Sequence, residues 1–123
     1  MRRRGFTLIE LLVVMAIIAT LLAIVAPRYF RHLDHAKDTA LHETLNVVRD
    51  AIDKYRADKD RYPASLEELV EQRYLRQLPV DPISGSKDAW IVIPPPDDPG
   101  GGVSDIQSGS AGSDEAGVAY RDY

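Results

Sequence analysis

The sequence predicts an α+β fold, in which one long N-terminal helix carries a short second helix and a small antiparallel sheet. Three observations predict this class. An uncharged, mostly apolar run covers residues 11–27. Beyond it, apolar residues recur at helical spacing as far as Tyr55. Short apolar stretches between proline- and glycine-rich segments fill the last third of the chain, which is typical of strands and loops.

The first helix is expected over residues 6–57. As a helix, residues 6–27 would rise about 33 Å, enough to cross the hydrocarbon core of a bilayer. The arginines at positions 2–4 precede this stretch and favour a cytoplasmic N-terminus. Pro27 has no N–H group, so we expect the helix to be kinked or loosened there.

Beyond Pro27 the helix is expected to be amphipathic and to form the spine of a small domain. One stripe of the helix collects the apolar residues Leu33, Leu41, Leu45, Val48, Ile52 and Tyr55. A metal site on this helix is conceivable, but its ligand spacing matches no standard motif, and histidines beside a helix are common on surfaces. The candidate ligands are His32, His35 and His42, with Asp38 or Glu43 assisting.

The remaining elements are short. Ser65 is expected to cap a helix over residues 66–75, because Glu67 and Glu68 in its first turn suit the helix dipole. Three short strands are then expected, at residues 89–93, 103–106 and 118–120.

The N-terminal stretch has three interpretations. A secretory signal would end in a small-x-small site; Ala26 could close such a site, but Ile24 suits it poorly and Pro27 would follow the cut. A plain membrane anchor explains the apolar run but not Gly5 or Glu10. A carboxylate near a membrane core costs about 2.5–3.5 kcal/mol, so Glu10 needs a reason to be there. The third interpretation supplies one.

The segment Gly5-Phe6-Thr7-Leu8-Ile9-Glu10 resembles the processing site of type IV pilins and pseudopilins. The resemblance implies that a prepilin peptidase cuts between Gly5 and Phe6 and methylates the new amino group of Phe6. It also implies that Glu10 of one subunit meets the Phe6 ammonium of its neighbour during assembly. Alternatively, Glu10 lies near enough to the membrane surface to reach water. The implied divisions are a leader at 1–5, a transmembrane and filament-core helix at 6–27 and a periplasmic globular domain at 28–123.

The rest of the chain resembles the major pseudopilin of type II secretion systems, general secretion protein G. The matching residues are Arg61-Tyr62-Pro63, Leu66 with Leu69, Tyr74-Leu75, Leu78-Pro79-x-Asp81-Pro82, Asp105-Ile106-x-Ser108-Gly109 and the late aromatic Tyr123. The chain departs from that family in its short middle and in its last position, where tryptophan is frequent. The resemblance implies a pilin-like fold and a structural subunit of a periplasmic filament that drives protein export across the outer membrane. It implies anchoring in the bacterial inner membrane, with the C-terminal domain in the periplasm. Expected partners are further copies of the chain, the prepilin peptidase, other pseudopilins and inner-membrane assembly proteins.

Major pseudopilins hold a calcium ion in their C-terminal loop, and the resemblance places that loop at residues 108–118. Asp114 is the main expected ligand and Glu115 a weaker one. Calcium takes six to eight oxygen ligands, so backbone carbonyls would complete the site. The carbonyls expected to do so lie near Ser108, Ser110 and Val118. By composition alone, the same residues describe a flexible acidic loop.

Charge and motifs exclude other classes of function. The formal net charge is −4, and loss of the leader arginines makes it more negative, which argues against nucleic acid as a partner. No nucleophile–base pair, phosphate-binding loop or metal-ligand cluster supports an enzyme. A type IV pilus or competence pilin is the main alternative, opposed by the absence of cysteine and by Asp81-Pro82. A small membrane-anchored binding module is a further one.

Overall fold

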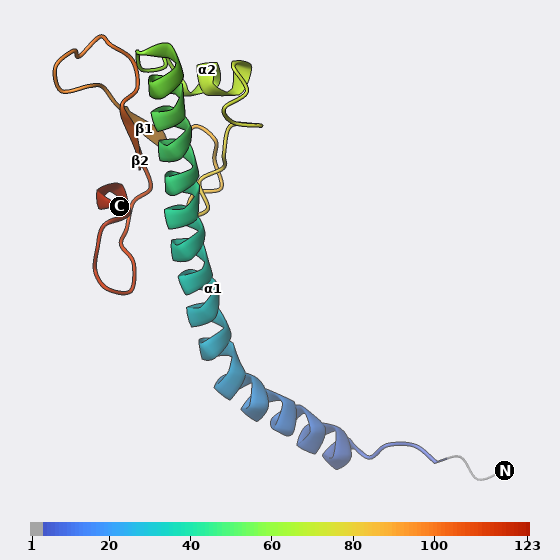
Figure 1. Ribbon diagram of the computed structural model, residues 1–123. Helices are drawn as coiled ribbons and strands as arrows, with labels where there is room; N and C mark the ends of the chain where they lie inside the picture. Colours follow the sequence, from blue (N-terminus) through green and yellow to red (C-terminus); the bar gives the residue numbers. More distant parts are fainter. Residues whose placement is uncertain (1–3) are drawn as a thin grey trace. The chain divides into compact units, whose positions relative to one another are not determined.

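The structure is a computed structural model that describes residues 4–123. Its elements follow the order α1, α2, β1, β2 and a final 3-10 helix, η1 (Figure 1). The chain forms two compact units, Met1–Asp34 and His35–Tyr123. Residues 1–3, part of the expected leader, lie outside the described residues. The predicted α+β class, with one long N-terminal helix, is confirmed.

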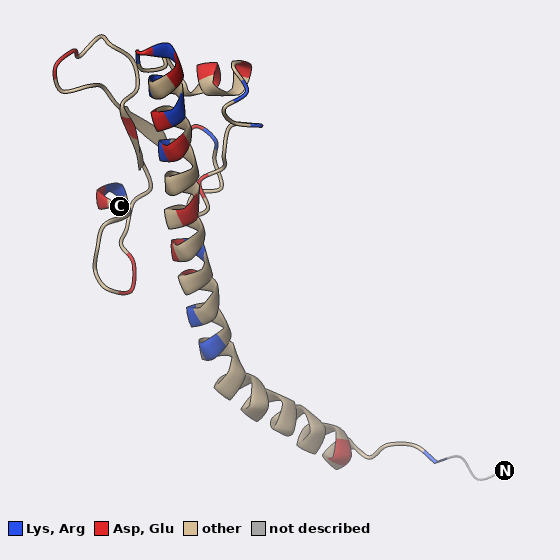
Figure 2. Cartoon of the chain, viewed as in Figure 1, with Lys and Arg blue, Asp and Glu red and all other residues tan. Residues whose placement is uncertain are grey.

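Helix α1 runs from Leu8 to Lys59, close to the predicted bounds. Figure 2 shows its long uncharged stretch as a continuous tan run after the acidic residue in the first turn. The helix continues through Pro27 without interruption, and the kink or loosening expected there stays a prediction. A proline removes one backbone donor, and the apolar side chains on both sides of it keep favouring helix.

In the unit His35–Tyr123, α1 supplies the spine of the hydrophobic core. Its buried apolar residues are Leu41, Leu45, Val48, Ala51, Ile52 and Tyr55. Leu33 was expected on this stripe but lies in the other unit and is 39% exposed. Elements α2, β1 and β2 complete the same core through Leu66, Leu69, Trp90 and Ile106. Removing this apolar surface from water is the main term that stabilises the unit.

Helix α2 spans Leu66–Glu71 and is shorter than predicted. It starts as expected, because the Ser65 side chain accepts a hydrogen bond from the Glu68 N–H. It ends early because Arg73 adopts a left-handed backbone with φ of 64°. The Tyr74 N–H then bonds the Leu69 carbonyl at 2.8 Å, which closes the helix in a Schellman-type cap. Glycine usually takes this position in helix caps. Because Arg73 takes it here, the sequence gives no signal for the end of the helix.

Strands β1 (Trp90–Ile93) and β2 (Asp105–Ser108) form an antiparallel pair, with Trp90 opposite Ser108. The first strand confirms the prediction, and the second begins two residues later than expected. The prediction of a third strand at residues 118–120 is wrong. Instead, Ala119 forms one isolated bridge with Ser113, and η1 follows over Tyr120–Asp122.

Asp81 is a fully buried carboxylate that joins the loop before β1 to the end of β2. Its Oδ2 accepts the hydroxyl groups of Ser108 at 2.6 Å and Ser110 at 2.8 Å, and its Oδ1 accepts the Ile83 N–H. A buried carboxylate is tolerated only when such donors surround it. The Asp-Pro pair that resembles major pseudopilins therefore has a structural role in this chain.

Glu68 joins the C-terminal end of α1 to α2. Its carboxylate accepts the Tyr55 hydroxyl at 2.5 Å, the Arg61 guanidinium at 3.0 Å and the Ala64 N–H at 2.6 Å. These donors favour the charged form. The hydroxyl of Tyr55 contributes most, and together they lower the pKa of Glu68 from 4.5 to about 2.

A Glu68→Gln variant is expected to lose about 2 kcal/mol of unfolding free energy at neutral pH, because a charged acceptor is replaced by a neutral one. The lowered pKa gives wild type an advantage that is complete above pH 4.5 and disappears as the pH falls toward 2. Chemical denaturation of both proteins across this range measures the difference. Other carboxylates contribute equally to both proteins, so the difference in unfolding free energy reports on Glu68. A difference that does not change with pH would contradict the lowered pKa of Glu68.

Candidate functional site

The expected cleavage site lies in a segment without regular structure, residues 4–7, ahead of α1. Phe6 is 93% exposed. A Cβ atom placed on Gly5 would meet no atom within 4 Å, so the fold itself does not require glycine there. An exposed, irregular backbone is what a protease needs in order to reach a peptide bond. If glycine is required at this position, the requirement is therefore imposed by a molecule that binds the segment and not by the fold of the chain.

Thr7 and Glu10 form a reciprocal capping box at the start of α1. The Thr7 N–H donates to Glu10 Oε2 at 2.9 Å, and the Glu10 N–H donates to Thr7 Oγ1 at 3.2 Å. The box satisfies two of the backbone donors that every helix N-terminus leaves free. The negative charge of Glu10 also suits the positive end of the helix dipole.

The role of Thr7 was missed in the sequence, although the pattern Thr-x-x-Glu before an apolar run is a recognised start signal for helices. The capping box gives Glu10 a local function in addition to its expected one in assembly. A carboxylate bonded in this way still has free lone pairs, because each oxygen can accept more than one hydrogen bond.

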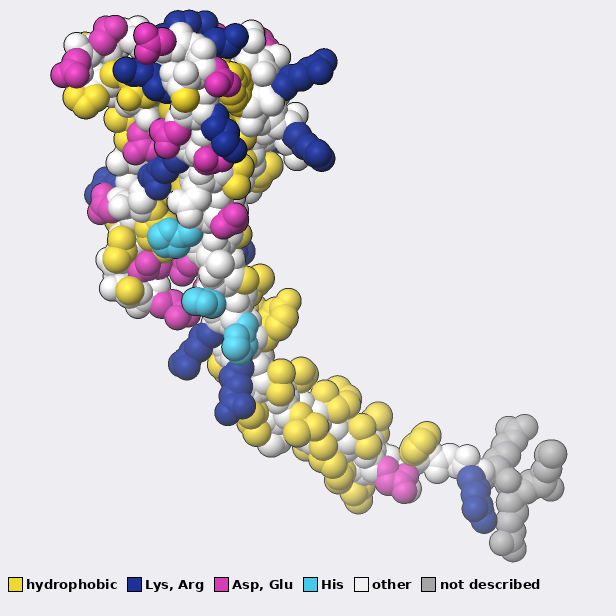
Figure 3. All heavy atoms as spheres, in the orientation of Figure 1, with side chains coloured by type: hydrophobic (Ala, Val, Ile, Leu, Met, Phe, Trp, Pro, Cys, Tyr) yellow, Lys and Arg dark blue, Asp and Glu magenta, His cyan; other side chains and the backbone are white. Residues whose placement is uncertain are grey.

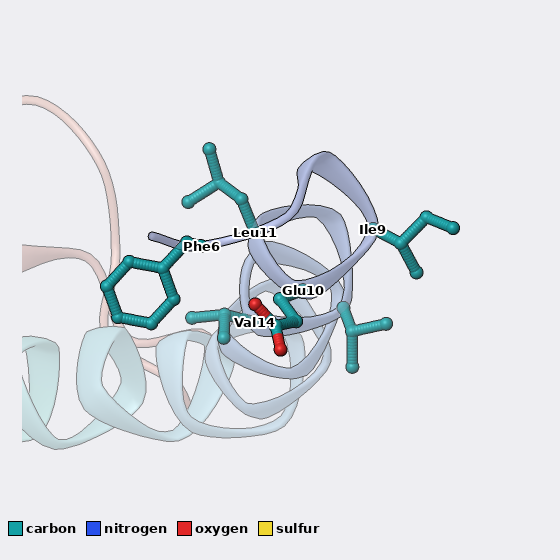
Figure 4. A pocket seen from close by; sticks show the side chains of 6 residues that line it. Phe6, Ile9, Glu10, Leu11 and Val14 are labelled. Carbon is teal, nitrogen blue, oxygen red and sulfur yellow. The ribbon is translucent and has the colours of Figure 1, made fainter. Parts of the chain in front are cut away.

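Glu10 lies beside a shallow apolar groove on the first turns of α1. The groove is lined by Phe6, Ile9, Glu10, Leu11, Val13 and Val14. Figure 4 shows the carboxylate between the Phe6 ring on one side of the helix and Ile9 on the other. No cationic side chain bonds this carboxylate in the described part of the chain. The site therefore presents an anion on an apolar surface, an arrangement that favours a cation brought by another molecule.

The apolar stretch that follows is almost entirely exposed (Figure 3). Within the described residues, α1 is the one helix long and apolar enough to cross a membrane, and the most apolar part of it is unburied. The single polar side chain of the stretch is satisfied within the helix, since Thr20 Oγ1 donates to the Ala16 carbonyl at 2.8 Å. A helix that meets all its own hydrogen bonds can lie in lipid or against copies of itself.

The expected calcium ligand Asp114 is already surrounded by hydrogen-bond donors. Its Oδ1 accepts the N–H groups of Ala116 and Val118, both at 2.9 Å, and its Oδ2 accepts the Tyr123 hydroxyl at 2.6 Å. These bonds, with that of Tyr123 the largest, lower the pKa of Asp114. Glu115 is exposed. The residues around Asp114 thus fit a hydrogen-bonded turn better than a calcium cage, and calcium binding stays a prediction.

The histidines of α1 do not build a metal centre either. No group of three or more His, Cys, Asp or Glu side chains is placed to hold a metal ion within residues 4–123. His42 instead stacks on the Tyr123 ring, with centroids 4.0 Å apart.

Comparison of the sequence with known protein families also singles out the N-terminal segment. Residues 1–26 match the prokaryotic N-terminal methylation motif. The type II secretion system core protein G of Pseudomonas aeruginosa is 37% identical in an alignment 101 positions long, which covers 67% of this chain and 71% of that protein. The protein of the same name from Escherichia coli K12 is 31% identical over 66% of this chain and 67% of its own length.

Similarity extends, over a smaller share of the chain, to competence proteins. The competence protein ComGC of Halalkalibacterium halodurans is 31% identical over 58% of this chain and 70% of its own length. No solved structure matches the chain. The match to the Pseudomonas protein covers about two thirds or more of both sequences. This chain also has a long apolar N-terminal helix whose first residues lie within the methylation motif. The chain therefore belongs to the family of type II secretion system core protein G, the major pseudopilins.

Proposed function

We propose that the protein is a structural subunit of a type II secretion pseudopilus, cleaved after Gly5, methylated on Phe6 and assembled through its apolar helix. The observation that carries this proposal is the exposed Gly5–Phe6 bond next to an anionic helix start, which is followed by an uncharged run over residues 11–27. An anchor alone needs neither feature. Family membership and the methylation motif over residues 1–26 support the same function.

Cleavage changes the charge of the N-terminus. The uncut chain carries arginines at positions 2–4, which favour retention on the cytoplasmic side of the membrane. The cut removes them and leaves one ammonium on Phe6, four residues before Glu10. The mature N-terminus then lacks the three arginine charges that hold the uncut chain at the cytoplasmic surface. Extraction of the helix from the membrane therefore costs less electrostatic free energy.

Assembly requires Glu10 to change or extend its partners. In the free subunit, the capping box with Thr7 satisfies part of the carboxylate. In the filament, the Phe6 ammonium of a neighbouring subunit adds a charge-assisted bond in a dry environment, where such bonds are strong. The exposed apolar side chains of residues 11–26 then pack against those of neighbouring helices.

The remaining expectations follow from this role. Subunits wait in the inner membrane with residues 28–123 in the periplasm and are recruited by the inner-membrane secretion machinery and other pseudopilins. The protein is a substrate of the prepilin peptidase and carries out no catalysis or nucleic-acid binding of its own. A competence pilin is the second candidate function, favoured by the similarity to ComGC.

Complementation with cross-linking tests the proposal. The chain has no cysteine, so one cysteine introduced in the apolar helix as Ile17→Cys reports contacts between helices. In a strain that lacks its own core protein G, we expect restored export and an oxidant-dependent disulfide-linked dimer, because one thiol per chain can bond to one neighbour. Export without this dimer would contradict packing of the apolar helices in a filament. Restored DNA uptake in a competence mutant, without restored export, would select the second candidate.

A further inference from the structure

The loop after β2 is closed by hydrogen bonds that converge on Asp114. Besides the two N–H groups that its Oδ1 accepts, the Asp114 N–H donates to the Val118 carbonyl at 2.9 Å, and the Gly117 N–H donates to the Asp114 carbonyl at 3.1 Å. Gly117 has φ of +85°, a conformation that few other residues adopt without strain. Residues 114–118 are therefore a self-contained turn.

Tyr123 fastens this turn to helix α1. Its hydroxyl donates to Asp114 Oδ2 at 2.6 Å, and its ring stacks on His42 with an interplanar angle of 12°. Its ring also meets Tyr120 edge-on at 5.7 Å. Figure 1 shows the loop and the C-terminus, in orange and red, beside the part of α1 drawn in green. One side chain thus contacts the loop, η1 and the spine.

Arg49 holds the backbone of Tyr123 from the other direction. Its Nη2 donates to the Tyr123 carbonyl at 2.8 Å and to the Ile106 carbonyl at 3.2 Å, and its Nε donates to Asp105 Oδ1 at 2.8 Å. The guanidinium therefore ties β2 and Tyr123 to the same turn of α1. Its planar set of donors suits this task, because each N–H points in a fixed direction.

The surroundings of the Tyr123 hydroxyl keep it protonated. Burial raises its pKa most, followed by the hydrogen bond to Asp114 and by the charge of Asp38. Asp38 is 8% exposed, and its Oδ1 has no hydrogen-bond partner within residues 4–123. A neutral phenol is the form that can donate to Asp114. A buried carboxylate oxygen without a donor is also a feature of cation sites, and the response of Asp38→Asn to calcium separates the two.

We propose that Tyr123 closes the C-terminal loop of this chain, through Asp114, His42 and Arg49, in the role that calcium is expected to take in this family. The oxygens of Asp114 are the reason. Both carboxylate oxygens, its carbonyl and that of Val118 already accept protein donors. Calcium takes six to eight oxygens, and no group of three or more His, Cys, Asp or Glu side chains within residues 4–123 is placed to supply them. This inference concerns stability and does not depend on filament assembly.

The test uses the full-length mature chain in detergent micelles. Tyr123→Phe removes the hydroxyl and keeps the ring stack, and Asp114→Asn weakens the same bond from the other side. We expect each variant to exchange amide hydrogens in residues 109–119 about tenfold faster, as for one charge-assisted hydrogen bond. The double variant should be no faster than Asp114→Asn alone, because that change already weakens the bond that Tyr123→Phe removes. Tyr74→Phe is the matched control, because it loses a Tyr–Asp bond to Asp58 elsewhere and should leave this loop unchanged.

The same proteins are then compared in millimolar calcium and in chelator, with unfolding followed by the fluorescence of Trp90, the single tryptophan. We expect equal wild-type midpoints in the two buffers, and no loss of stability in Asp38→Asn or Glu115→Gln. A calcium-dependent rise of about 5 °C or more that Asp38→Asn or Asp114→Asn abolishes would overturn the proposal. So would a Tyr123→Phe loop that exchanges at the wild-type rate.

Discussion

Glu10→Ala is expected to give a protein that is inserted, cleaved and methylated but does not form filaments. Removing one partner of a buried ion pair costs about 3–5 kcal/mol, or about 100-fold or more in the equilibrium for adding a subunit. Insertion should improve slightly, because the apolar run loses its carboxylate. Electron microscopy of sheared filaments and mass analysis of the membrane fraction measure the two effects separately.

Glu10→Gln is the matched control for this prediction, because Glu10 has two roles in the structure. A glutamine oxygen can still accept the Thr7 N–H, so the capping box survives while the charge is lost. If pairing with the Phe6 ammonium drives assembly, Gln is as defective as Ala. Filaments at wild-type yield from the Gln variant would show that only the helix cap matters.

Gly5→Val is expected to leave the chain uncut, an all-or-none effect on processing. Nothing in the fold opposes the change, since a Cβ at this position meets no atom within 4 Å and the segment is irregular. A β-branched side chain also suits an extended backbone. The block therefore arises where the peptidase must hold the bond. Membrane insertion and the folding of His35–Tyr123 should be unchanged.

Gel mobility and N-terminal sequencing measure this outcome, with Gly5→Ala as the graded control. One methyl group should slow cleavage, and the branched side chain should stop it. A Gly5→Val chain cut at the wild-type position and rate would mean that the glycine is incidental. The interpretation of residues 1–5 as a leader would then lose its main support.

Features that rest on repeating patterns were predicted well from the sequence. The long helix follows from an apolar run and a helical stripe, each of many residues, so a local exception such as Pro27 does not change the outcome. The family resemblance was also recognisable, because the processing motif is contiguous and depends on residue order. The buried stripe from Leu41 to Tyr55 is a direct consequence of its spacing.

Features that rest on single side chains were missed. The early end of α2 depends on Arg73 adopting a left-handed backbone, a choice that residue identity disfavours. The third strand gave way to a turn because Asp114 satisfies backbone donors that a strand would have used. Tyr123 meets Asp114 and His42 only through tertiary packing, which no local pattern encodes. The capping box at Thr7 is the exception, because the pattern Thr-x-x-Glu before an apolar run is local and can be recognised in the sequence.

The most direct test of the central claim is the intact mass of the protein from membranes of cells with and without a prepilin peptidase. We predict a chain that begins at Phe6 and carries one additional methyl group, found only when the peptidase is present. Recovery of the uncut chain in both strains, or of a chain cut near Ala26, would contradict the account. The protein would then be an ordinary anchor or an exported domain, and its filament mechanism would have to be abandoned.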